Sequence, residues 1–218
     1  GPSYDGYTYL PASDTRGSIF VSWDTTRVLL TNFANDSHSI TGYILPMEGT
    51  PWWLTVVYGP QEDEHKTNFL NKLLERRSIC PGPWLVMGDF NLILYAADKS
   101  NSNLDRRMMG KFKRFVDDNA LKELFLHGRK YTWSNERDMP TLTKIDRAFV
   151  SVDWELDHPD CLLQALSTEY SDHCPLHLAL HERMHVRRRF HFEKFWVKMD
   201  SFSDVVKEAW VCDPDITD

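Results

Sequence analysis

Apolar residues in the first third of the chain fall into short runs that polar and turn-forming residues separate. The runs lie at 19–23, 28–33, 39–45 and 52–58. Their length and spacing predict an antiparallel meander of strands. The period then changes, because apolar residues recur at helical intervals over 64–77 and Pro81 follows, so a helix is predicted there.

The remaining runs continue this mixture of strands and helices. Residues 84–87 are apolar throughout, which is typical of a strand buried on both faces of a sheet. Further strands are predicted at 144–151, 162–166 and 176–181, and further helices at 106–118 and 201–210. Strands that look antiparallel, with separate helices, favour an α+β fold in which sheets pack face to face and helices lie outside.

Composition limits the number of domains and the environment. A chain of 218 residues that is 42% hydrophobic can bury one large core and carry a short extension. We predict a domain at 4–183 and a C-terminal linker with an amphipathic helix at 184–218, and residues 1–3 look like a tag scar. Four cysteines without Cys-x-x-Cys spacing indicate reduced thiols in the nucleus or cytoplasm. No apolar run is long enough for a membrane span.

Three short acidic motifs are the candidate chemistry. They are Gly88-Asp89-Phe90-Asn91, Lys144-Ile145-Asp146-Arg147 and Ser171-Asp172-His173-Cys174-Pro175. The first follows a predicted strand directly and the third lies soon after another, so the motifs can converge at strand ends. Taken alone, the first motif is equally consistent with an ordinary turn. The net charge of −7 argues against a protein that relies on nonspecific attraction to phosphates.

Taken in order, the motifs resemble those of the endonuclease/exonuclease/phosphatase superfamily, from about Tyr7 to His181. The likeness is strongest to the endonuclease-like domain of plant non-LTR (LINE-type) retrotransposons. Four further segments carry it: Thr15 to Phe20, Val57 to Pro60, Tyr131 to Asn135 and Arg147 to Ser151. The resemblance implies a two-sheet β-sandwich flanked by helices. In the family, strands bearing an Asn and a metal-binding Glu precede the segment at Arg16, so we expect this chain to lack those N-terminal strands.

The resemblance also implies roles for individual catalytic residues. Asp89 matches the base that accepts the proton of the attacking water, and Asn91 matches the residue that positions the phosphate. His173 matches the histidine that contacts the phosphate, and Asp146 the carboxylate that orients it and favours its charged form. Tyr58 matches an active-site tyrosine, for which a core tyrosine with its hydroxyl in water is the alternative.

The remaining implied roles concern metal and substrate. Asp172 matches a residue near the metal, which is Mg²⁺ or Mn²⁺ in the intact family. With half of the ligands missing, we expect weak or absent metal binding in this chain. Trp133 and Arg147 are predicted to contact substrate, with ordinary core packing as the alternative for Trp133.

The predicted function is therefore a retrotransposon-derived, Mg²⁺-dependent DNA endonuclease domain, inactive or weakly active in this form. A catalytically silent protein-interaction module remains the alternative, favoured by the acidic charge and the missing Glu. Absent strands would also uncover a sheet edge. We expect a partner protein, a second copy of the chain or the aromatic-rich extension at 187–210 to occupy that edge.

Overall fold

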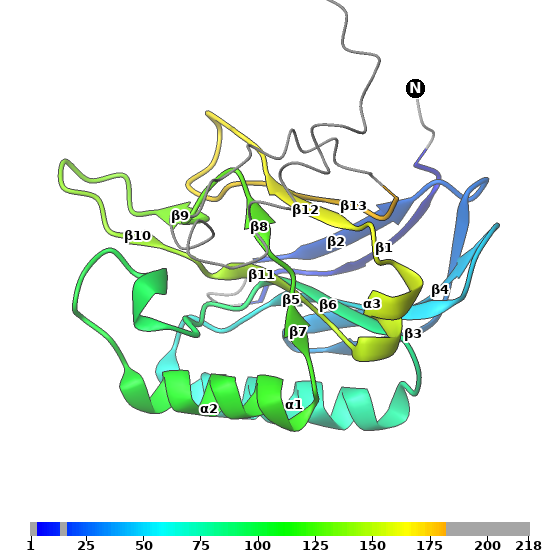
Figure 1. Cartoon of the computed structure of the whole chain (residues 1–218), viewed down its shortest axis with the longest axis horizontal. Helices are drawn as coiled ribbons and strands as arrows, with labels where there is room; N and C mark the ends of the chain where they lie inside the picture. The colour runs from blue at the N-terminus through cyan, green and yellow to red at the C-terminus, as the bar shows by residue number, and fades with distance from the viewer. Residues whose placement is uncertain (1–3, 14–16, 182–218) are drawn as a thin grey trace, which may run out of the picture. The chain divides into compact units, whose positions relative to one another are not determined.

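The computed structural model describes residues 4–13 and 17–181, within the unit Gly1–Arg183. The linker and helix predicted beyond residue 183 lie outside the described residues. A six-stranded mixed sheet forms the centre of the fold, in the order β3-β4-β5-β6-β11-β7 (Figure 1). Its strands are β3 (Val28–Asp36), β4 (Ser39–Pro46), β5 (Trp52–Tyr58), β6 (Trp84–Asp89), β7 (Lys122–Glu123) and β11 (Asp146–Val150).

The predicted antiparallel meander is confirmed in part. Strands β3, β4 and β5 pair antiparallel, as the apolar runs indicate. The run at 19–23 instead forms β2 (Ile19–Trp23), which pairs antiparallel with β1 (Gly6–Leu10) in a separate two-stranded sheet. No apolar run predicts β1, and the predicted meander therefore gives β2 the wrong neighbour.

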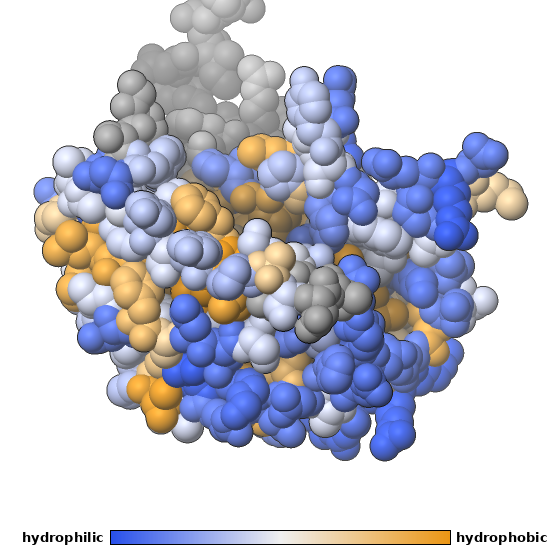
Figure 2. Space-filling view, turned by 180° about the vertical axis from the view of Figure 1, so that it is seen from behind, coloured by the Kyte–Doolittle hydropathy of each residue, from blue (hydrophilic) through white to orange (hydrophobic). Residues whose placement is uncertain are grey.

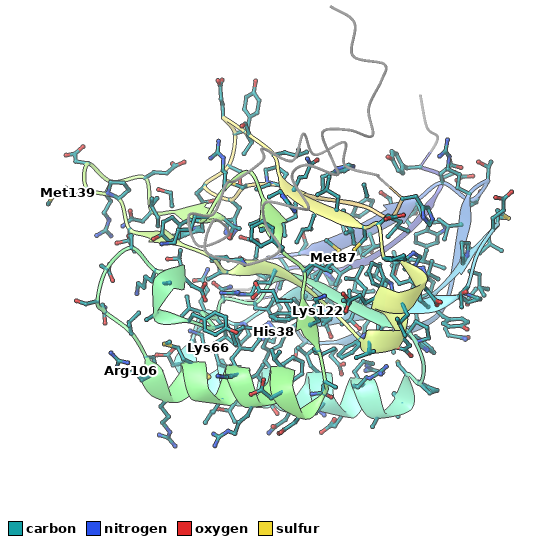
Figure 3. The ribbon with its side chains drawn as sticks, viewed as in Figure 1. His38, Lys66, Met87, Arg106, Lys122 and Met139 are labelled. Atoms are coloured by element: carbon teal, nitrogen blue, oxygen red, sulfur yellow. The ribbon has the colours of Figure 1, made fainter. Side chains whose placement is uncertain are left out.

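Two smaller groups of strands complete the sheets. β8 (Leu126–His127), β12 (Leu162–Ala165) and β13 (Leu176–Ala179) form a three-stranded sheet in the order β13-β12-β8. β9 (Trp133–Ser134) and β10 (Leu142–Thr143) form a hairpin. The loop between them projects from the fold, and Met139 on it is 90% exposed (Figure 3).

Three α-helices occur among the described residues. They are α1 (Asp63–Ile79), α2 (Arg106–Asp118) and α3 (Val152–Asp157), and a short 3₁₀ helix, η1, spans Ala96–Asp98. α1 and α2 lie side by side along one face of the large sheet (Figure 1). α2 begins at an aspartate cap, since the Asp105 side chain accepts a hydrogen bond from the Met108 N–H at 2.9 Å.

The large sheet buries apolar side chains on both faces, as the run at 84–87 predicts. Trp84 and Val86 of β6 point to a core that α1 and α2 cover, whereas Leu85 between them points to a second core. This alternation follows from the two-residue period of a strand. In β11, Phe149 joins the helix-side core and Val150 joins the other. The fold is therefore α+β, with two mixed sheets, two antiparallel pairs of strands and helices outside.

In the view from behind, hydrophilic residues cover most of the lower side, where the helices lie, and hydrophobic residues gather at the left and centre among polar ones (Figure 2). The structure contains no helix, within the residues described, that is long and apolar enough to cross a bilayer. Cys80, Cys161 and Cys174 are all free thiols.

Candidate active site

The site begins as a row of three side chains across neighbouring strands. Tyr58, the last residue of β5, pairs in register with Asp89, the last residue of β6. Asp89 in turn pairs with Asp146, the first residue of β11. Residues that are directly opposite in a sheet point to the same face. The strand ends thus bring together three of the residues predicted from the sequence.

His173 completes this group from a distant part of the chain. Its Nδ1 lies 2.9 Å from Oδ2 and 3.1 Å from Oδ1 of Asp146. This hydrogen bond is the main reason why the pKa of His173 is raised above its ordinary value, against the opposing effect of burial. Because Asp146 engages Nδ1, Nε2 is the ring nitrogen that remains to meet a substrate.

A single threonine connects the two halves of this pair. The Thr132 hydroxyl accepts hydrogen bonds from the backbone N–H groups of Ile145 and Asp146, at 3.1 and 3.0 Å. The Thr132 carbonyl accepts from the N–H of Cys174 at 2.7 Å, next to His173. Thr132 is completely buried. Sequence reasoning gave this residue no role, since no local pattern marks a threonine that bridges two strands.

Asp89 accepts hydrogen bonds from Asn91, and the pKa of its carboxyl is raised. The Asn91 backbone N–H donates to Asp89 Oδ1 at 2.7 Å, and its Nδ2 donates to Asp89 Oδ2 at 3.0 Å and to the Gly59 carbonyl at 2.8 Å. Burial, followed by the charge of Asp146, raises the pKa of Asp89 to about 7. The structure therefore places Asn91 as a support for Asp89, with its amide donors engaged, rather than as a free phosphate donor.

Two glycines let the backbone approach this row closely. Gly88 has a φ of +132°, and a Cβ built there would lie 2.2 Å from the Val57 carbonyl oxygen. A Cβ at Gly59 would lie 2.2 Å from the Phe90 carbonyl oxygen. No other residue type fits either position without moving the backbone.

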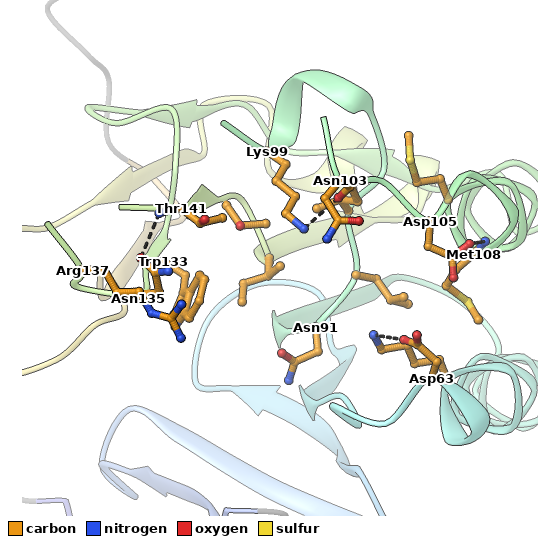
Figure 4. Close-up of a pocket in the computed structure, with 16 residues that line it drawn as sticks. Asp63, Asn91, Lys99, Asn103, Asp105, Met108, Trp133, Asn135, Arg137 and Thr141 are labelled. Atoms are coloured by element: carbon orange, nitrogen blue, oxygen red, sulfur yellow. Dashed lines mark hydrogen bonds and ion pairs between the residues drawn. The ribbon is translucent and has the colours of Figure 1, made fainter. Parts of the chain in front are cut away.

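Trp133 joins the third motif to the site and lines two cavities. It forms an isolated β-bridge with His173, and its Nε1 donates to Asp172 Oδ2 at 2.8 Å. It lines a cavity of about 480 Å³ together with Asn91, as Figure 4 shows. It also lines a second cavity, of about 420 Å³, together with Asp172. This placement is compatible with the predicted contact between Trp133 and substrate.

Arg147 lies elsewhere, and its predicted substrate contact needs correction. The side chain is 1% exposed and forms ion pairs with Asp98 and Glu123. It also donates to the Lys144 carbonyl at 3.0 Å. A guanidinium that is buried and neutralised in this way cannot reach a bound strand. The sequence placed it near the site because it follows Asp146, but successive strand residues point to opposite faces.

The described donors do not fit a divalent metal site. Both Asp89 oxygens accept hydrogen bonds from Asn91, and Asp172 Oδ2 accepts one from Trp133. Over residues 4–13 and 17–181, no group of three or more His, Cys, Asp or Glu side chains is arranged to hold a metal ion. We therefore assign no metal ligand, and the predicted metal role of Asp172 finds no support in this geometry.

Comparison with known proteins identifies one family and several solved structures of similar fold. The sequence model of the Endonuclease/Exonuclease/phosphatase family matches residues 6–173. No curated protein gives a significant match. The solved endonuclease domain of TRAS1, a telomere-specific non-LTR retrotransposon, has a TM-score of 0.62 and 10% identity, over 81% of this chain and 79% of its own.

Two further solved structures are similar. A functionally unknown conserved protein from Enterococcus faecalis V583 has a TM-score of 0.51 and 16% identity, over 80% of this chain and 77% of its own. TDP2 from D. rerio, humanized by 14 mutations, has a TM-score of 0.50 and 15% identity, over 78% of this chain and 74% of its own. At these identities the similarity shows a common fold alone.

Proposed function

Since the chain belongs to the endonuclease/exonuclease/phosphatase family, we propose that its site hydrolyses phosphodiester bonds of DNA, as a nuclease-like domain of the retrotransposon type. The observation that carries this proposal is the pairing of His173 with Asp146, which shares a sheet row with Asp89. An imidazole with a raised pKa, near a carboxyl of near-neutral pKa, supplies the proton chemistry that ester hydrolysis needs.

The proposed reaction uses Asp89 as the base. A carboxyl with a pKa of about 7 is partly ionised at neutral pH and can accept a proton from water. As the water oxygen forms its bond to phosphorus, that proton passes to Asp89, the ester P–O bond breaks, and the departing oxygen takes a proton from solvent water. Tyr58 stands next to Asp89 in the sheet row, so we place its hydroxyl on the same side of the phosphate as the attacking water.

His173 supplies positive charge to the phosphate. Asp146 holds Nδ1, so the protonated ring directs its Nε2–H to a non-bridging phosphate oxygen, where negative charge grows in the transition state. Asn91 acts through Asp89, because its hydrogen bonds keep the Asp89 carboxylate in place.

Members of this family typically use a divalent metal ion. The described donors do not form such a site, so we route no step of the reaction through a metal. We propose that cleavage is slow and that Mg²⁺ raises it little.

The test is cleavage of supercoiled plasmid and of abasic DNA, with and without Mg²⁺. We expect slow cleavage that His173→Ala and Asp89→Asn both abolish. Arg114→Gln serves as the matched control, since Arg114 is exposed on α2 and lines none of the cavities around the site. Cleavage that persists in His173→Ala would contradict the proposal. Fast cleavage that requires Mg²⁺ and His173 would overturn the metal-independent route.

A second candidate function is a protein-interaction domain, and one surface favours it. Tyr7, Tyr9 and Phe20 stand on one face of the β1–β2 sheet, each about three-fifths exposed. The rings of Tyr7 and Phe20 stack with centroids 6.1 Å apart. Exposed aromatic groups of this kind are enriched at protein interfaces. If the chain cleaves no DNA under any condition, this candidate becomes the better one.

A further inference from the structure

Two basic residues lie between two cavities at the edge of the site. Arg129 and Lys130 are exposed on the connection from β8 to β9. Both line the cavity of about 420 Å³ that Trp133 and Asp172 share, and both also line a neighbouring cavity of about 430 Å³. The family resemblance and the acidic motifs gave neither residue a role.

The backbone before Arg129 is fixed. His127 at the end of β8 pairs in parallel register with Gln164 of β12. Gly128 follows with a φ of +94°, and a Cβ built there would lie 3.2 Å from the Ala165 carbonyl oxygen. A glycine in this conformation, packed against a neighbouring strand, sets the direction in which the chain leaves the sheet. Arg129 therefore follows, one glycine later, a strand that is paired within the three-stranded sheet.

The guanidinium of Arg129 is oriented but keeps its charge uncompensated. Its Nη1 lies 3.5 Å from Cys174 Sγ, and its Nη2 donates to the Ser167 hydroxyl at 3.2 Å. Both partners are neutral, and Cys174 follows His173 directly. No ion pair found among the described residues includes Arg129. A guanidinium has more N–H donors than these two bonds use.

The surrounding charge makes such a group necessary for an anionic ligand. Asp172 and Glu136 line the same cavity, so a phosphate entering it faces two carboxylates. The Trp133 Nε1–H donates to Asp172 Oδ2. An arginine that donates bidentate hydrogen bonds to phosphate offsets this repulsion locally, in a chain whose net charge is −7.

We propose that Arg129 binds a backbone phosphate of the DNA strand in the cavity that Trp133, Asp172 and Cys174 line. This inference rests on the proposed function, because it concerns the same strand whose cleavage His173 supports. Arg129 is then a positioning residue, which holds the strand across Trp133, and it takes no part in bond cleavage.

The test measures binding without cleavage. Fluorescence anisotropy of a fluorescein-labelled single-stranded DNA oligonucleotide is recorded against the 218-residue chain over a series of KCl concentrations, with EDTA present. For Arg129→Gln we expect weaker binding and a slope of log K against log[salt] that is smaller by roughly 0.7, the loss of one phosphate contact. Arg129→Lys keeps the charge and should keep most of the slope. Arg114→Gln, on α2, should leave the slope unchanged.

The outcomes separate this inference from the proposed function. An Arg129→Gln slope equal to that of the unmodified chain, or an equal loss in Arg114→Gln, overturns the assignment of Arg129 even if His173-dependent cleavage is found. Loss of cleavage in His173→Ala with a reduced Arg129→Gln slope supports both. An unmodified chain that binds no oligonucleotide at low salt overturns the inference, whatever the cleavage assay shows.

Discussion

The imidazole of His173 and the carboxylate of Asp146 form one hydrogen-bonded unit, with Nδ1 2.9 Å from Oδ2, although the two residues lie 27 positions apart. Asp146 begins β11 of the large sheet, whereas His173 lies on the segment that leads into β13. The contact therefore joins two sheets at the point where the acidic motifs meet.

The first prediction concerns this pair. The pKa of His173 is raised, first by its hydrogen bond to Asp146, so Asp146→Asn should lower it. Asp172→Asn removes a carboxylate that makes only the smallest contribution, and should lower the pKa less. NMR titration of the imidazole measures both variants. Equal shifts in the two would show that general charge, rather than the specific bond, sets the acidity.

The second prediction concerns the stability effect of Asp89. Its folded pKa of about 7 lies above the ordinary value of 3.8, so the folded state binds more protons between these pH values. The contribution of protonated Asp89 to the free energy of unfolding is thus fully present below about pH 4, and it is lost as pH rises through 7. Asp89→Asn removes this loss, which is on the order of 4 kcal/mol.

Thermal unfolding at pH 5 and pH 8 provides the measurement for Asp89. The Tm of Asp89→Asn minus that of the unmodified chain should be larger at pH 8. Asp138→Asn, on the exposed loop between β9 and β10, is the control and should give the same difference at both pH values. A difference for Asp89→Asn that does not grow with pH would show that the carboxyl is not destabilised by burial.

The third prediction concerns the buried cation Arg147. Arg147→Met leaves the buried Asp98 without its cationic partner and leaves Glu123 paired with Lys144 alone, and should lower the free energy of unfolding by about 3–5 kcal/mol. Lys122→Met breaks the exposed pair between Lys122 and Glu155, and should cost about 1 kcal/mol or less. Urea denaturation compares the two. Similar losses in both variants would mean that the Arg147 network contributes no more than a surface pair.

The fourth prediction uses two glycines with opposite surroundings. Gly88→Ala forces a Cβ to within 2.2 Å of the Val57 carbonyl at a φ of +132°, so the β5–β6 edge must shift. We expect a lower free energy of unfolding and a displaced Asp89 side chain. Gly110→Ala, within α2 and with open space around it, should stabilise the fold by about 0.5–1 kcal/mol. A stabilised Gly88→Ala would refute the steric argument.

The sequence predicted the elements whose pattern is local. Helix α2 begins and ends where the apolar spacing places it, at 106–118, and β5 spans 52–58 as its apolar run indicates. Pairing is a different matter, because β2 could join either β1 or β3 and only tertiary packing chooses between them. A run of alternating residues identifies a strand without identifying its neighbour.

The same limit applies to the site. Asp89, Asp146 and His173 are recognisable as motifs, and the structure brings them together. The engagement of Asn91 with Asp89 and the burial of Arg147 depend on which face each side chain takes, which a motif does not state. Arg129 carries no motif at all, since its neutral partners come from two distant segments.

Thr132 gives the His173–Asp146 pair a property beyond its own chemistry. Its hydroxyl accepts a hydrogen bond from the first residue of β11, and its carbonyl accepts one from the segment that carries His173. Thr132 therefore connects the two sheets. Any separation of the layers must then lengthen the distance between imidazole and carboxylate. The pKa of His173 consequently reports whether the two sheets are packed together. A loosened domain should release the His173 proton at lower pH, and with it the charge that a bound phosphate requires, before the strands themselves come apart.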